Sequence, residues 1–114
     1  RVIIETTGLA DPAPVIHTLM TDPQVSARFR LARVATVVDA VNGLATLGAH
    51  PEAIKQVAVA DQLLLSKTDL EQGAAQLPPL VAELRRLAPG AQIHDAAAPG
   101  FDLRALADDR VAYD

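Results

Sequence analysis

The chain has 114 residues, of which half are apolar, with a formal net charge of −4 and no cysteine. This length suits one domain, since most domains have about 50–200 residues. The absence of cysteine excludes disulfides and thiolate metal sites. Lysine and arginine are dispersed, so we expect no nucleic-acid partner. No apolar run reaches the about 18–20 residues that span a membrane, and no signal peptide is visible, so we expect a cytoplasmic protein without a membrane partner.

The first stretch of the chain is predicted to be a buried parallel strand, because residues 2–4 form a short β-branched run. Glu5 ends this run and Gly8 then allows a sharp turn. Ligands bind outside the carboxyl ends of strands in open α/β sheets, so this carboxylate could reach a phosphate, a metal ion or a water. The chain enters this strand directly from Arg1, and we therefore expect residues 1–114 to be one incomplete domain whose upstream part is missing.

Alternation of helices and strands continues along the chain and predicts an α/β fold, a mostly parallel sheet with flanking helices. Turn residues and apolar spacing delimit the predicted elements. In chain order these are a helix from 11 to 20, a helical piece from 22 to 29, a strand over 31–39, a short helix over 43–48, a helix over 50–58, a strand over 61–65, a helix over 77–87 with Pro78 and Pro79 in its first turn, a strand over 91–94, a loop over 96–100 and a helical turn over 102–106.

Three of the predicted strands end at groups that could bind a ligand. Glu5 follows the first strand, Asp39 follows the second, and Lys67 with Asp69 follows the third. Parallel strands place their carboxyl ends at one edge of a sheet, so we expect these groups to lie together. Asp39 has an alternative role as a cap on the next helix.

The sequence Ser-Lys-Thr-Asp at residues 66–69 suits the recognition of guanine. The carboxylate of Asp69 can accept two hydrogen bonds from the N1–H and 2-amino groups of guanine, and adenine has no equivalent pair. The aliphatic stem of Lys67 can cover one face of a purine, and Ser66 can hold the turn through the loop backbone. A guanine nucleotide is therefore preferred over ATP as the expected ligand.

Three pieces of the chain, in this order, resemble the CobW-like family of P-loop GTPases. Residues 5–12 resemble its Walker B region, in which ExxG replaces DxxG; residues 36–42 resemble the following strand and its exit; and residues 56–70 resemble the helix, strand and guanine-recognition motif. The match covers about two thirds of the chain. ExxGLADP followed at this spacing by a Ser-Lys-x-Asp sequence is a specific combination.

The resemblance implies a GTP-binding and GTP-hydrolysing metallochaperone or metal-cofactor insertion protein, of a type linked to metal delivery and cobalamin synthesis. It implies GTP and Mg²⁺ as cofactors, Zn or Co as cargo, and a metal-receiving client protein as partner. By the same resemblance, the catalytic residues are Glu5, which would also touch the Mg²⁺ environment, and Gly8, and the nucleotide-binding residues are Ser66, Lys67, Asp69 and Ala97.

The departures from the family pattern limit what the chain can do alone. It has no GxxxxGK[ST] phosphate-binding loop, no CxCC metal motif and no separate C-terminal domain of the family. We therefore expect residues 1–114 alone not to hydrolyse GTP, and we expect an unpaired sheet edge that favours self-association. The three histidines lack metal-ligand spacing. The alternative interpretation is a non-catalytic α/β protein-interaction domain with vestigial nucleotide motifs.

Overall fold

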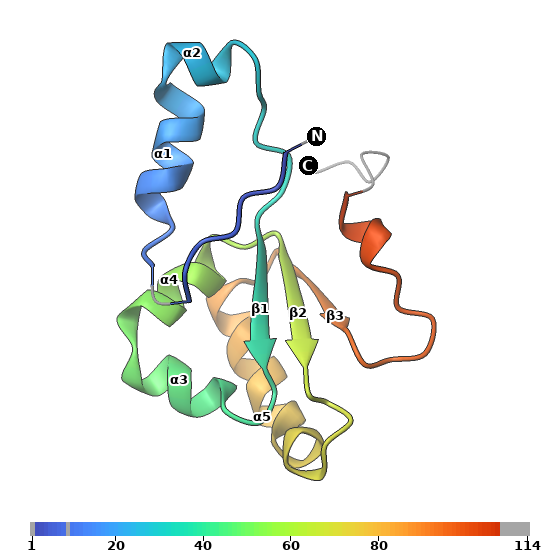
Figure 1. The fold of residues 1–114 in the computed structure, drawn as a ribbon. Coiled ribbons are helices and arrows are strands. Elements are labelled where there is room, and N and C mark those ends of the chain that lie inside the picture. Colours follow the sequence, from blue (N-terminus) through green and yellow to red (C-terminus); the bar gives the residue numbers. More distant parts are fainter. Residues whose placement is uncertain (1, 9, 108–114) are drawn as a thin grey trace.

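A computed structural model describes residues 2–8 and 10–107 of the chain. Three parallel strands form one sheet in the order β1-β2-β3, with β1 at Ala35–Asp39, β2 at Gln62–Ser66 and β3 at Gln92–Asp95 (Figure 1). Ala35 of β1 pairs with Gln62 of β2, which pairs with Gln92 of β3. The predicted α/β fold with a parallel sheet is therefore confirmed.

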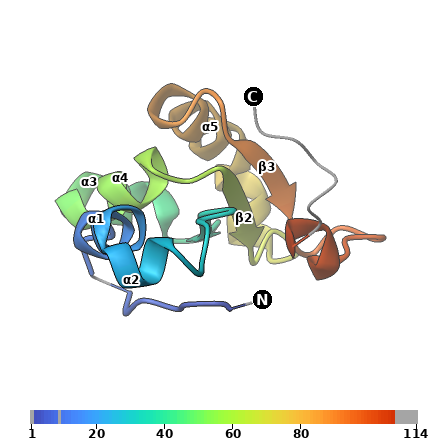
Figure 2. The ribbon, with the colours of Figure 1, turned by 90° about the horizontal axis from the view of Figure 1, so that it is seen from above.

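Three helices cover one face of this sheet. They are α3 (Gly43–Ala49), α4 (Pro51–Ala58) and α5 (Glu71–Leu87), and they lie together on one side of the strands, whereas the N-terminal segment lies on the other side (Figure 2). Two further helices, α1 (Ala13–Thr21) and α2 (Pro23–Ser26), extend beyond the amino-terminal end of the sheet, and a 3₁₀ helix, η1 (Leu103–Ala107), follows β3 (Figure 1). No helix among the described residues is long and apolar enough to cross a membrane.

The core lies between the sheet and the helices on its covered face. Leu63 and Leu65 of β2 pack there with Leu80 and Leu84 of α5, and all four are buried. Side chains alternate between the two faces of a strand, so Val37 points to the opposite face, where its side chain is 69% exposed. The apolar strands thus form a core on one face and leave the opposite face of β1 open to solvent.

The opening segment is not a strand, and our prediction of a buried strand there is wrong. The segment is extended and runs beside β1 in the same direction (Figure 1), but among the described residues the sheet ends at β1. Val2, Ile3 and Ile4 are 61%, 86% and 55% exposed. A β-branched run becomes a strand only when a neighbouring strand pairs with its backbone, and none does so here.

The long helix also differs from its prediction. α5 begins at Glu71, so Pro78 and Pro79 lie inside the helix and not in its first turn. Each proline lacks the N–H that would donate to a carbonyl one turn earlier. Burial of Leu80 and Leu84 against the sheet offsets this loss, because tertiary packing supplies most of the stability of a helix in a protein.

Candidate nucleotide-binding site

The carboxyl ends of the three strands meet at one edge of the sheet, at Asp39, Ser66 and Asp95. The loops that follow these strands carry most of the predicted site residues. Since β2 is central, its loop at residues 66–69, here called the base loop, lies between the other two strand ends. Side chains from both neighbouring strands contact the base loop.

Asp39 anchors the base loop from the β1 side. One carboxylate oxygen lies 2.9 Å from Nζ of Lys67, and the carboxylate also accepts the backbone N–H of Val41 at 2.8 Å and the side-chain N–H of Asn42 at 3.1 Å. Lys67, followed by these smaller contributions, lowers the pKa of the Asp39 carboxyl to about 2. Asp39 therefore both caps the turn after β1 and pairs with a predicted base-contacting lysine.

The backbone of the base loop is in an unusual conformation at Lys67. Its φ is 61°, in the left-handed region that non-glycine residues rarely adopt. The Lys67 carbonyl faces Gly73 of α5 so closely that a Cβ at position 73 would lie 2.1 Å from the carbonyl oxygen. Glycine is therefore required at position 73. Sequence reasoning missed this residue, although a glycine inside a helix costs about 0.5–1 kcal/mol and so signals a special role.

Asp95 anchors the base loop from the β3 side. It accepts hydrogen bonds from the Thr68 hydroxyl and, at 3.0 Å, from the backbone N–H of Ala97. One carboxylate thus joins the base loop to the loop that follows β3. The Ala97 N–H, proposed as a donor to guanine, is already bonded here, so a guanine oxygen would have to displace Asp95. Sequence reasoning did not predict the part that Asp95 plays.

Asp69 is exposed at the end of the base loop. Within the part of the chain that the structure describes, its carboxylate has no hydrogen-bond or ion-pair partner, unlike Asp39 and Asp95. Ser66 contributes its carbonyl to the Ala40 N–H at 2.9 Å, whereas its hydroxyl bonds to no described residue. The base loop is therefore held by its lysine and threonine, and its aspartate remains available to a ligand.

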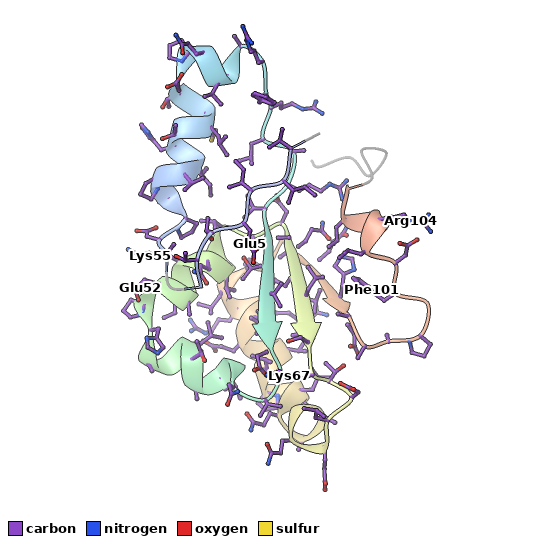
Figure 3. All side chains as sticks on the ribbon, viewed as in Figure 1. Glu5, Glu52, Lys55, Lys67, Phe101 and Arg104 are labelled. Atoms are coloured by element: carbon purple, nitrogen blue, oxygen red, sulfur yellow. The ribbon has the colours of Figure 1, made fainter. Side chains whose placement is uncertain are left out.

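Glu5 does not join the edge at which the base loop lies. Figure 3 shows it beside the amino-terminal part of β1, whereas Lys67 lies beyond the carboxyl ends of the strands. The expectation that all the strand-end groups meet at one edge is wrong for Glu5, because residues 2–5 have not joined the sheet.

Gly8 follows in an exposed turn. It does not have a positive φ, and a Cβ there would meet no atom within 4 Å. The conformation of the turn therefore does not itself require a glycine at this position, in contrast to Gly73.

No group of three or more metal-ligating side chains occurs among residues 2–8 and 10–107. The histidines illustrate this. His94 on β3 bonds to Gln62 across the sheet and packs near Phe101, with ring centroids 6.2 Å apart, and His17 lies 3.3 Å from the Thr21 hydroxyl on α1. The described residues therefore form no cluster of three or more side chains that could hold a metal ion.

Comparison with known protein families assigns the chain to one of them. The model of the CobW/HypB/UreG nucleotide-binding domain matches residues 1–95. The chain belongs to this family. The matched residues include the base loop at the carboxyl edge of this CobW-family domain. They also include residues 5–8 and Ala10, here called the ExxG turn.

Relatives of this CobW-family domain include zinc proteins. The zinc chaperone YjiA of Escherichia coli strain K12 is 37% identical over 89 residues, which are 78% of this chain and 28% of YjiA. The zinc-regulated GTPase metalloprotein activator 1 of Schizosaccharomyces pombe is 36% identical over 71 residues, 61% of this chain and 17% of that protein. A crystal structure of Zn(II)-bound YjiA GTPase matches 87% of this chain and 30% of its own, with TM-score 0.76 and 33% identity. The chain thus spans less than a third of these relatives.

Proposed function

We propose that this chain supplies the guanine-recognition part of a GTP-hydrolysing metallochaperone, and that residues 1–114 are one portion of its GTPase domain. The observation that carries the proposal is the base loop. Its lysine has a φ of 61°, donates from Nζ to Asp39 and places its carbonyl against Gly73, while the carboxylate of Asp69 is exposed and has no described partner. A loop that presents one carboxylate without a described partner beside a lysine stem suits a planar donor edge.

Guanine fits this arrangement better than adenine does. Its N1–H and 2-amino group would both donate to Asp69, and the stem of Lys67 would cover the ring. Ser66 would support the loop backbone. Ala97 would donate its N–H to the guanine oxygen after releasing Asp95, which would then keep its bond to Thr68.

We assign the phosphate side of the site to the ExxG motif. Glu5 would orient the attacking water, and this role requires it to lie closer to the carboxyl edge than it does here. Gly8 would let the backbone approach the γ-phosphate, and its freedom from packing is consistent with that role. Bound Mg²⁺ would neutralise phosphate charge in such a reaction, and the described residues contain no cluster of three or more ligands for it.

Zinc is the metal that we propose as cargo. Two relatives are named for zinc, and the solved relative holds Zn(II). No described cluster in this chain would bind the ion, so we expect zinc to be bound by residues outside the described part of the chain. A metal-receiving client protein would complete the function.

Competition for a fluorescent guanine nucleotide on the complete gene product that carries this chain tests the proposal. We expect GTP and GDP to displace the probe at concentrations at least 100-fold lower than ATP, because adenine has no donor pair for Asp69. Hydrolysis of GTP, measured as phosphate release, should accompany binding. Equal displacement by ATP and GTP would contradict guanine recognition, and binding without hydrolysis would favour the non-catalytic interaction domain.

A further inference from the structure

The ExxG turn is held by one side chain of α4. Nε2 of Gln56 lies 3.0 Å from the carbonyl oxygen of Gly8 and 2.8 Å from that of Ala10. A glutamine amide carries two N–H donors, so this turn uses both of them. The opposite orientation of the amide would place its oxygen against two carbonyl oxygens. The two contacts therefore fix the orientation of the side chain as well as the position of the turn.

The backbone of Gln56 is in turn tied to the sheet. The Thr36 hydroxyl donates to the Gln56 carbonyl at 2.7 Å. This carbonyl lies in the last turn of α4, where carbonyl groups lack partners within the helix. Thr36 belongs to β1, the strand that ends at Asp39. Gln56 thus connects the ExxG turn to the strand whose end anchors the base loop.

Other contacts at the turn are weaker or local. Lys55 pairs with Asp11 at 3.2 Å, but the two side chains are 58% and 38% exposed, and exposed ion pairs contribute little (Figure 3 labels Lys55). The Ala10 N–H donates to the Thr7 carbonyl at 3.0 Å and closes the turn on itself. Gln56 is half-buried and makes two bonds, so among the described residues it is the main connection between the turn and α4.

We propose that Gln56 is a positioning residue for the ExxG turn, which it fixes against α4 so that the segment carrying Glu5 moves about a fixed point when GTP binds. The inference rests on the proposed function, in which this turn serves the γ-phosphate. Gln56 itself contacts no nucleotide and acts through the carbonyls of Gly8 and Ala10. Its loss should therefore affect the triphosphate and its hydrolysis, and leave GDP binding unchanged.

The test compares three variants of the complete gene product. Gln56→Met keeps the length of the side chain without the donors, and we expect kcat for GTP to fall about tenfold while GDP affinity stays at the parental value. Gln56→Lys retains a group that can donate to both carbonyls, and we expect it to recover at least half of the parental rate. Gln72→Met makes the same exchange at an exposed position of α5 and should match the parent.

A second readout does not depend on nucleotide. Hydrogen exchange at the Ala10 amide should become about tenfold faster in Gln56→Met, while exchange in β2 stays unchanged. Unchanged exchange at Ala10, or a loss of GTP and GDP affinity by the same factor, would overturn the inference. Failure of the parent to hydrolyse GTP would refute the proposed function instead, and the exchange rate would still decide whether Gln56 holds the turn.

Discussion

Single residues decide the geometry of the base loop, and Asp39 is the clearest case. Its ion pair with Lys67 is partly solvated, so the pair should contribute about 0.5–1 kcal/mol. We expect Asp39→Asn to weaken GTP binding by the complete gene product about threefold, because Lys67 loses its anchor. Isothermal titration with GTP measures this, and Asp22→Asn, which removes the same charge from the cap of the remote α2, is the matched control. An unchanged GTP affinity would show that Asp39 does not contribute to nucleotide binding.

The same carboxylate predicts a pH dependence of stability. In the folded chain the pKa of Asp39 is about 2, below its ordinary value of 3.8. The ion pair therefore contributes its full stabilisation above about pH 4, and this contribution is lost as the pH falls from about 4 to 2. Urea unfolding at several pH values should show a smaller loss of stability over this range in Asp39→Asn than in the parent. Parallel curves for the two proteins would argue against the ion pair.

Gly73 allows a test of the close contact between α5 and the base loop. A methyl group there would overlap the Lys67 carbonyl, and overpacking of this kind typically costs about 1–3 kcal/mol. We expect Gly73→Ala to lower the free energy of unfolding by about 2 kcal/mol and to weaken GTP binding as the base loop shifts. Gly48→Ala in α3 is the control, because a Cβ at position 48 meets open space and alanine favours the helix. Equal stability of both variants would refute the steric argument.

At the scale of elements, β2, β3, α3 and α4 were predictable from the sequence, whereas the opening strand and the start of α5 were not. The strands predicted over 61–65 and 91–94 became β2 and β3 with shifts of about one residue, whereas the strand predicted over 31–39 formed β1 only over Ala35–Asp39. The start of α5 could not be predicted in the same way. Pro78 indicated a first turn, but packing of Leu80 and Leu84 extends the helix back to Glu71.

The prolines inside α5 predict that the helix can be made more stable by substitution. Pro79 is exposed and lacks the N–H that a helical residue would donate. We expect Pro79→Ala to restore this hydrogen bond and to raise the free energy of unfolding by about 1 kcal/mol, since a proline inside a helix costs more than alanine. Thermal unfolding of the complete gene product measures the change. A lower melting temperature would mean that the ring of Pro79 packs usefully or that α5 is bent to accommodate it.

For the molecule as a whole, the fold class could be predicted from the sequence, but the contacts that surround residues 66–69 could not. The roles predicted for Asp69 and Lys67 rest on chemistry that is local to four residues. Asp39 and Asp95 bond to the base loop, and Gly73 lies against its Lys67 carbonyl. These contacts join segments about 5 to 30 residues apart, so they become visible only in the folded chain. The position of Glu5 could not be predicted either, because a strand needs a neighbour that its own sequence does not specify.

The open face of β1 predicts association of the 114-residue chain. Val37 is 69% exposed on a strand at the edge of the sheet, and such edges pair readily with other chains. We expect Val37→Lys to shift the chain toward the monomer in sedimentation velocity, because a charged side chain opposes strand pairing. Val59→Lys, the same change at an exposed position after α4, should leave the distribution unchanged. An identical sedimentation distribution for the parent and both variants would show that the chains do not associate through the open face of β1.

We proposed that Asp69 binds the donor edge of guanine, and a change of the nucleotide base tests this role. In the complete gene product, Asp69→Asn places an amide opposite the donor edge of guanine, so GTP affinity should fall at least tenfold. Xanthosine triphosphate carries an oxygen in place of the 2-amino group and should bind the variant more tightly than the parent. Titration of both proteins with both nucleotides gives the four affinities, and an unchanged GTP affinity in Asp69→Asn would contradict guanine recognition by Asp69.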